Sequence, residues 1–114
     1  MIAKDIYSRA LISLGYEDDQ TFKDRAVVVI GQVYDELIEA FPDLERASIT
    51  SLGSDVNLPE NVCFGAMVYG VAEKLALGSG DGELQQYFAR KYDQARSKLT
   101  IIDKIYDHMG MWGV

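Results

Sequence analysis

The chain has 114 residues, a formal net charge of −7 and a single cysteine. This length predicts one domain, and the lone cysteine excludes an intrachain disulfide or a cysteine-based metal site. Residues 1–81 hold fourteen acidic and six basic side chains, a net of −8, whereas residues 82–114 hold four and five, a net of +1. Such acidity disfavours nucleic-acid binding, which depends on neutralising phosphates.

Two amphipathic helices are predicted in the first part of the chain. Apolar side chains recur every three or four residues over 4–14, a helix that Gly15 ends. A longer apolar stripe follows over 22–40. Thr21 is the expected N-cap of this second helix, and Pro42 is expected to stop it.

The segment 43–58 has no helical pattern. Small or polar residues alternate with apolar ones over 47–52 and 56–58, with a turn at Gly53. This alternation predicts a short β-hairpin or an extended loop around residues 47–58. Two such short strands are marginally stable alone, so we expect them to lie on the helices or to pair with a neighbouring subunit.

A helical hairpin between Pro59 and Leu99 is the clearest feature of the sequence. Pro59 suits the first turn of a helix over 60–77, whose apolar residues cover nearly its whole circumference and should lie at the centre of the domain. Gly78 is expected to end this helix in a left-handed conformation, and Asp81 to cap the next one. Apolar positions then recur at spacings of three and four: Leu84, Phe88, Tyr92, Ala95, Leu99, Ile102, Tyr106 and Met109.

Two glycines interrupt the first helix of this hairpin. Gly65 and Gly70 each cost about 1 kcal/mol relative to alanine, which we expect the close approach of another backbone to offset. The apolar run over 62–72 is too short and too glycine-rich to span a membrane, which needs about 20 residues. Cys63 is expected to be a buried thiol. The fold class is therefore mainly α: a small bundle of about four helices built on the hairpin, in a single domain over 1–114.

The sequence contains no recognisable catalytic or metal-binding set. The only histidine, His108, has no nucleophile and acid to join, and Asp35 and Glu39 lack the Glu-x-x-His partner of helical di-metal sites. The glycine-rich turn over 78–82 lacks the Lys-Ser/Thr ending of a phosphate loop and carries Asp81 where a phosphate would sit. We therefore expect no cofactor, no metal and no enzymatic activity.

The end of the chain contains two candidate contact regions. One is a basic group that is either a solvated face or a patch for an acidic partner; it consists of Arg90, Lys91, Arg96 and Lys98. The other is the apolar segment 107–114, which either folds back on its own domain or docks on another chain. Its candidate docking residues are Met109, Met111, Trp112 and Val114.

Several motifs occur in a fixed order along the hairpin. A Leu-Pro step opens the apolar helix, a Tyr-Gly-x-Ala-x-x-Leu-Ala run follows at 69–76, and a Gly-Asp turn precedes a Phe-x-x-x-Tyr step at 88–92. This order resembles the head–tail connector (adaptor) proteins of tailed bacteriophages, and the first helix is similar to theirs as well. The residues that match the family motif are structural ones: Pro59, Tyr69, Gly70, Ala72, Leu75, Gly80, Asp81, Phe88 and Tyr92.

The resemblance implies a structural virion protein of the virion neck, assembled in the bacterial host cytoplasm, and not an enzyme. Members of this family are small α-helical proteins, often with a short β-hairpin, that form a closed ring of about twelve copies. The ring sits under the portal protein and extends the DNA channel, and a stopper or tail-completion protein binds its other side. DNA passes such a channel without specific binding, and carboxylates lining it would repel the phosphates.

A second interpretation of the same residues involves no virus. The chain is then a small α-helical interaction or regulatory module that presents the basic face of its last helix to an acidic partner. Retention on capsid particles separates the two interpretations, because only a connector binds them.

Overall fold

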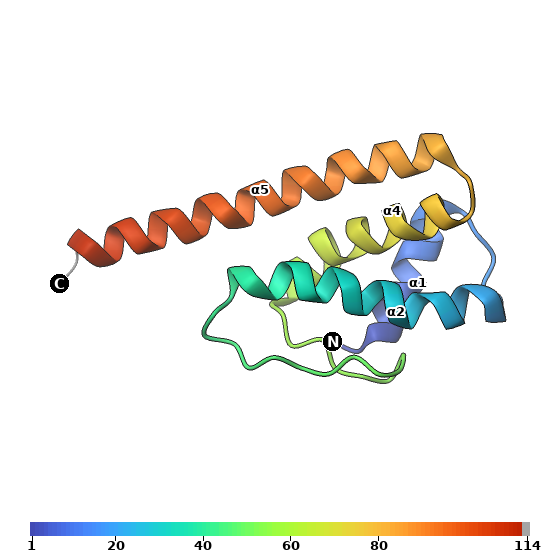
Figure 1. Ribbon diagram of the computed structural model, residues 1–114, viewed down its shortest axis with the longest axis horizontal. Helices are drawn as coiled ribbons and strands as arrows, with labels where there is room; N and C mark the ends of the chain where they lie inside the picture. The colour runs from blue at the N-terminus through green and yellow to red at the C-terminus, as the bar shows by residue number, and fades with distance from the viewer. Residues whose placement is uncertain (113–114) are drawn as a thin grey trace.

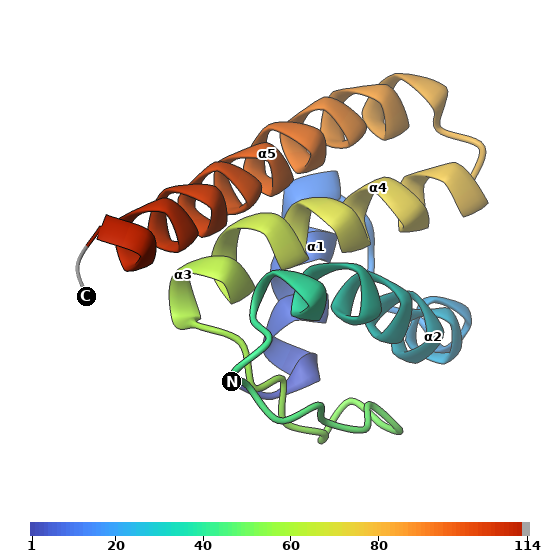
Figure 2. The ribbon, with the colours of Figure 1, turned by 60° about the vertical axis from the view of Figure 1, so that its left-hand side comes forward.

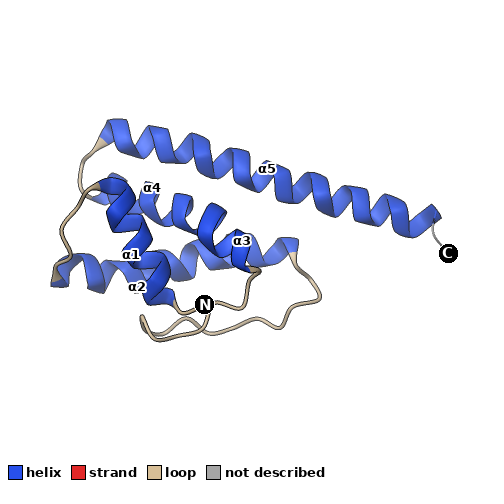
Figure 3. Cartoon of the chain, turned by 180° about the vertical axis from the view of Figure 1, so that it is seen from behind, coloured by secondary structure: helices blue, strands red, loops and turns tan. Residues whose placement is uncertain are grey.

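The computed structural model describes the backbone of residues 1–112 and the side chains of residues 1–99. The chain is mainly α-helical, as predicted, and no β-strand forms within this described part (Figure 3). In chain order the elements are α1 (Ala3–Leu14), α2 (Gln20–Leu37), a 3-10 turn η1 (Ile38–Ala40), α3 (Glu60–Val62), a π-helical segment η2 (Cys63–Met67), α4 (Val68–Gly78) and α5 (Gly82–Trp112).

Helix α4 is the central element of the bundle. It packs against α1, α2 and α5, and α3 and η2 lead into it at its N-terminal end (Figure 2). Its side chains are buried on most sides, including those of Val71 and Leu75, which have no exposed surface. The prediction that 60–77 forms the centre of the domain is confirmed, although the π-helical turn within it was not foreseen.

Gly70 is the point at which α2 and α5 both press on α4. A Cβ atom at Gly70 would lie 2.8 Å from Cγ1 of Val33 on α2 and 2.9 Å from Cε1 of Tyr92 on α5. The expected close approach is therefore present, but it is made by side chains and not by another backbone. The same expectation is wrong for Gly65, because a Cβ atom there would meet nothing within 4 Å.

The turn between α4 and α5 differs from the prediction in one residue. Gly80, and not Gly78, adopts the left-handed conformation, with φ of 76°. The N–H of Gly80 donates to the carbonyl of Leu77 (3.2 Å) and that of Asp81 to Ala76 (3.0 Å), which is the Schellman pattern of helix termination. As predicted, Asp81 caps the next helix: its carboxylate accepts the Leu84 N–H at 3.3 Å.

Two other helix starts also differ from prediction. Asp19, and not Thr21, is the N-cap of α2, because the Asp19 carboxylate accepts the N–H of Phe22 at 2.9 Å. Pro59 is the N-cap of α3 and precedes its first turn. Both starts are displaced from the prediction by only one or two residues, which is the usual uncertainty of helix boundaries.

The long connection between η1 and α3 is an extended loop and not a β-hairpin (Figure 1). Instead of pairing with itself, it pairs with the start of the chain through one isolated antiparallel bridge between Ile2 and Asp55. The loop carbonyls of Ser54 and Leu52 accept the N–H groups of Ala3 (2.9 Å) and Lys4. These free N–H groups at the start of α1 need partners, and the loop supplies them.

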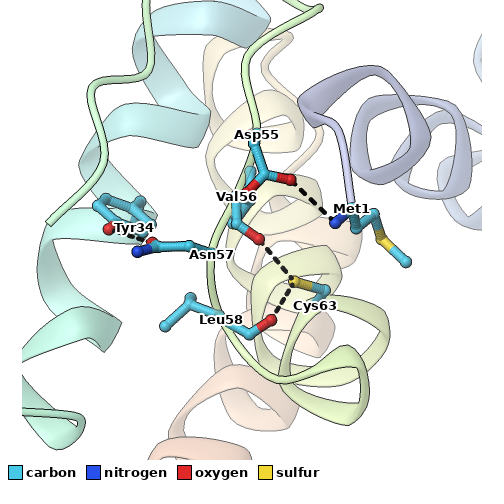
Figure 4. A network of polar contacts seen from close by, with 7 residues as sticks. All are labelled: Met1, Tyr34, Asp55, Val56, Asn57, Leu58 and Cys63. Atoms are coloured by element: carbon cyan, nitrogen blue, oxygen red, sulfur yellow. Dashed lines mark hydrogen bonds and ion pairs between the residues drawn. The ribbon is translucent and has the colours of Figure 1, made fainter. Parts of the chain in front are cut away.

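Polar contacts fasten the rest of this loop to the core (Figure 4). The hydroxyl of Tyr34 on α2 donates to Oδ1 of Asn57 at 2.6 Å, and the N-terminal amino group lies 3.2 Å from the Asp55 carboxylate. The buried Cys63 thiol points at the carbonyl oxygens of Val56 and Leu58, 3.8 and 3.6 Å away. Segment 52–58 is thus held by the chain itself and requires no neighbouring subunit.

The packing at Gly70 predicts opposite effects for two glycine substitutions. Gly70→Ala forces Val33 and Tyr92 apart, and this overpacking outweighs the gain in helix propensity, so we expect the free energy of unfolding to fall by about 1–2 kcal/mol. Gly31→Ala, inside α2 with nothing within 4 Å of the new methyl group, is the matched control and should raise it by up to about 1 kcal/mol. Urea unfolding measures both, and a stabilised Gly70→Ala variant would contradict the packing.

Candidate interaction surfaces

The residues of the family motif meet in the α4–α5 hairpin. Gly70 lies against Tyr92, the ring of Tyr69 stacks on that of Phe88 with centroids 6.4 Å apart, and Leu75 is fully buried. Ala72 is buried beside them, and Gly80 and Asp81 form the connecting turn; only Pro59 stands apart, at the start of α3. Most of the motif residues therefore pack one helical hairpin.

Glu36 joins three helices. Its carboxylate on α2 accepts the hydroxyl of Tyr92 on α5 at 2.6 Å and lies 3.5 Å from Nζ of Lys74 on α4. It also lies 3.6 Å from the Arg96 guanidinium, which stacks over the Tyr92 ring at 5.4 Å. Burial raises the pKa of the Tyr92 hydroxyl well above its usual 10, and the Glu36 carboxylate raises it further. Nothing in the sequence distinguishes Glu36 from the other acidic residues on the polar side of α2.

An open depression lies beside the α4–α5 turn. It is about 680 Å³ in volume, and Tyr16 from the end of α1 donates a hydrogen bond to Asp81 at 3.3 Å beside it. Helix N-termini attract anions through their free N–H groups, and here the carboxylates of Asp19 and Asp81 each accept one such N–H, on α2 and α5.

A groove of about 360 Å³ runs between η2 and α5. Small residues line it from both sides, among them Gly65 and Ala66 on η2 and Ala95 on α5, and Lys91 and Lys98 also line it. None of its described lining residues is acidic. The groove therefore combines small apolar residues with polar side chains and two lysines.

The structure divides the basic group of α5 between two faces. Arg96 points toward Glu36 on α2, whereas Lys91 and Lys98 flank the groove on the other face; Arg90 is exposed. Sequence reasoning identified these cations but missed the groove. The only sign of the groove in the sequence is Gly65, at which the sequence predicts the close approach of another backbone.

Cys63 is buried, and the remaining residues considered in the sequence lie on the polar surface or outside the described side chains. Burial raises the pKa of the Cys63 thiol, which makes it a structural and not a reactive cysteine. Within the described residues, no three His, Cys, Asp or Glu side chains cluster as metal ligands, and no helix is long and apolar enough to cross a bilayer. The side chains of His108, Met109, Met111 and Trp112, and the whole of Val114, lie outside the described residues.

Comparison with known proteins identifies no relative. A scan against protein families, a search of curated proteins and a search of solved structures each found no match to this chain. Information about the function of this chain therefore comes from its own residues.

The Glu36–Tyr92 contact predicts a specific loss of stability. Tyr92→Phe removes the hydroxyl and leaves a partly buried carboxylate with fewer partners, so the free energy of unfolding should fall by about 1–2 kcal/mol at neutral pH. Tyr87→Phe is the matched control because Tyr87 is exposed on the same helix, and its effect should stay within about 0.5 kcal/mol. Equal effects of the two substitutions in urea unfolding would show that the contact contributes nothing.

The raised pKa of Tyr92 also predicts a loss of stability at alkaline pH. Above pH 10 the tyrosine ionises in the unfolded chain but stays protonated in the folded one, so the folded state binds more protons and stability falls as pH rises. The contribution of the protonated Tyr92 hydroxyl to the free energy of unfolding is fully present below pH 10. Tyr92→Phe removes the hydroxyl, so the free energy of unfolding should fall less steeply between pH 10 and 11, by up to about 1.4 kcal/mol per pH unit. Urea unfolding of wild type and Tyr92→Phe at several pH values measures this difference.

Proposed function

We propose that this chain is a structural subunit of the head–tail connector of a tailed bacteriophage. It forms a ring under the portal protein, extends the DNA channel and joins the capsid to the tail or its stopper protein. The observation that carries the proposal is the position of the motif residues: those in the resembling order, from Tyr69 to Tyr92, pack one α4–α5 hairpin. In this proposal the chain acts through its surfaces and catalyses no reaction.

The shape of the subunit supports this proposal. The molecule extends over 52 × 29 × 17 Å, and the ribbon of α5 continues well past the other helices (Figure 1). A helix of 31 residues is about 46 Å long at 1.5 Å per residue, about three times the length of α4. A projecting helix of this kind provides a surface on which neighbouring subunits can pack.

The distribution of charge supports it as well. The net charge of −8 over residues 1–81 would repel DNA phosphates from a channel wall. The positive face of α5 remains available for protein contacts. In this proposal DNA passes through the ring without specific binding, and the protein contacts are with other copies, with the portal and with the tail-side protein.

Ring formation is the first test of the proposed function. We expect the purified protein, mixed with the portal protein of the same phage, to form rings that negative-stain electron microscopy shows on one end of the portal. Capsid particles should retain the protein during sedimentation. A protein that stays monomeric, forms no ring on isolated portals and is not retained by capsids would contradict the proposal, and would favour the interaction-module interpretation.

The C-terminal segment provides the second test. We propose that Met109, Met111, Trp112 and Val114 dock on the portal, because methionine and aromatic side chains are enriched in interface cores. Deleting residues 109–114 should leave the helical content and the thermal unfolding of the bundle unchanged, while capsid attachment is lost. If truncated protein completes infectious heads at normal efficiency in a complementation assay, the docking role is wrong.

A further inference from the structure

The groove between η2 and α5 has the chemistry of a binding slot for an apolar side chain with acidic neighbours. Gly65 leaves open space above its backbone, since a Cβ atom there would meet nothing within 4 Å. Lys91 and Lys98 flank that space. The Lys91 ammonium lies 5.7 Å from the Tyr87 ring centroid, and Lys98 is exposed. Among the described residues, neither lysine forms an ion pair with a carboxylate.

The chain carries a segment with the complementary chemistry. Leu44 is 39% exposed and lies between the exposed acids Asp43 and Glu45. Leu44 lies in a turn that is closed by a hydrogen bond from its N–H to the carbonyl of Phe41, 3.0 Å long. Among the described residues, no ion pair or side-chain hydrogen bond involves either carboxylate.

We propose that the groove of one chain receives Leu44 from a second copy of the same chain. Leu44 fills the space above Gly65, and the carboxylates of Asp43 and Glu45 pair with Lys91 and Lys98. The inference rests on the proposed function because it names the contact that would close the ring. Charge complementarity selects the second copy: two lysines line the groove, and the carboxylates of Asp43 and Glu45 on either side of Leu44 form no ion pair among the described residues.

This contact has a direction. The residues that line the groove and the residues of the Leu44 turn are different, and the chain does not fill its own groove with this turn. Each copy therefore offers one slot and one insert, and in the proposed ring these two engage different neighbours, which makes the interface heterologous and head-to-tail. Interfaces of this type close into rings when the rotation between copies is suitable and otherwise form open chains.

Charge reversal tests the pairing. Lys91→Glu with Lys98→Glu should raise the dissociation constant of self-association at least about tenfold in sedimentation equilibrium, because like charges then meet across the interface. Asp43→Lys with Glu45→Lys should do the same. All four substitutions in one chain restore opposite charges and should recover wild-type association.

A matched control separates the pairing from the change in net charge. Lys4→Glu with Arg90→Glu reverses two exposed cations that do not line the groove. This variant has the same net charge as the groove variant, and its dissociation constant should stay within about twofold of wild type, because charges away from an interface contribute little to binding.

Mixing the two defective variants tests the pairing in a second way. The groove variant keeps an intact insert for the intact groove of the insert variant, and the reversed groove and the reversed insert also carry opposite charges, so an equimolar mixture should recover the association that neither variant shows alone. Association of the groove variant at wild-type strength, or failure of the fourfold reversal to recover it, would overturn the proposal.

Cross-linking covers the case in which association in solution is weak. Leu44→Cys on one chain and Gln94→Cys on another place thiols on the insert and in the groove, and mild oxidation should link them into a 44–94 dimer. Leu44→Cys with Ser13→Cys, exposed on α1, should give no such dimer. Equal yields from both pairs would overturn the proposal.

The two proposals can fail separately. If portals and capsids bind rings of the charge-reversed groove variant as they bind wild type, the connector function stands and this interface is wrong. If the fourfold reversal recovers self-association but neither portal nor capsid binds the protein, the interface stands and the connector function is wrong.

Discussion

The missing side chain at Gly70 is the constraint on which the arrangement of the helices depends. Because Gly70 has no Cβ, Val33 from α2 and Tyr92 from α5 both rest on the backbone of α4. That position brings the Tyr92 hydroxyl within 2.6 Å of Glu36, and Lys74 and Arg96 complete the junction of three helices. Helix α5 is thereby held against α4 along its first half, and this positions the groove on its other face.

The charged side chains that meet inside the bundle are used for structural contacts. Its polar junction around Glu36 is occupied by contacts that hold helices together, and the carboxylates beside the glycine turn cap helix N-termini. What remains unpartnered in the described part is apolar or charged surface: the groove flanked by Lys91 and Lys98, and the acidic turn that presents Leu44. Such features are the ones on which the proposed contact between copies is built, because complementary charges select partners.

Contacts remote in sequence decided what the local pattern left open. The alternating pattern over 47–58 was compatible with a hairpin or an extended loop, and the loop forms because its hydrogen-bond partners are at the start of the chain, some fifty residues away. Gly78 and Gly80 are both suitable for a left-handed turn, and Gly80 adopts it, while the Arg25 guanidinium of α2 lies where a Gly78 Cβ would be. Local patterns carry no information about such remote contacts.

The sequence by itself determined the helices, the burial of 60–77 and the absence of a recognisable catalytic set, because periodicity, caps and breakers act between residues close along the chain. Only the tertiary structure decided which charges pair and which stay free. Arg96 and Lys98 are indistinguishable in the sequence, yet one is held at Glu36 and the other flanks the groove. Two residues on one helix point to different faces, and what each face meets is set by the packing of helices from elsewhere in the chain.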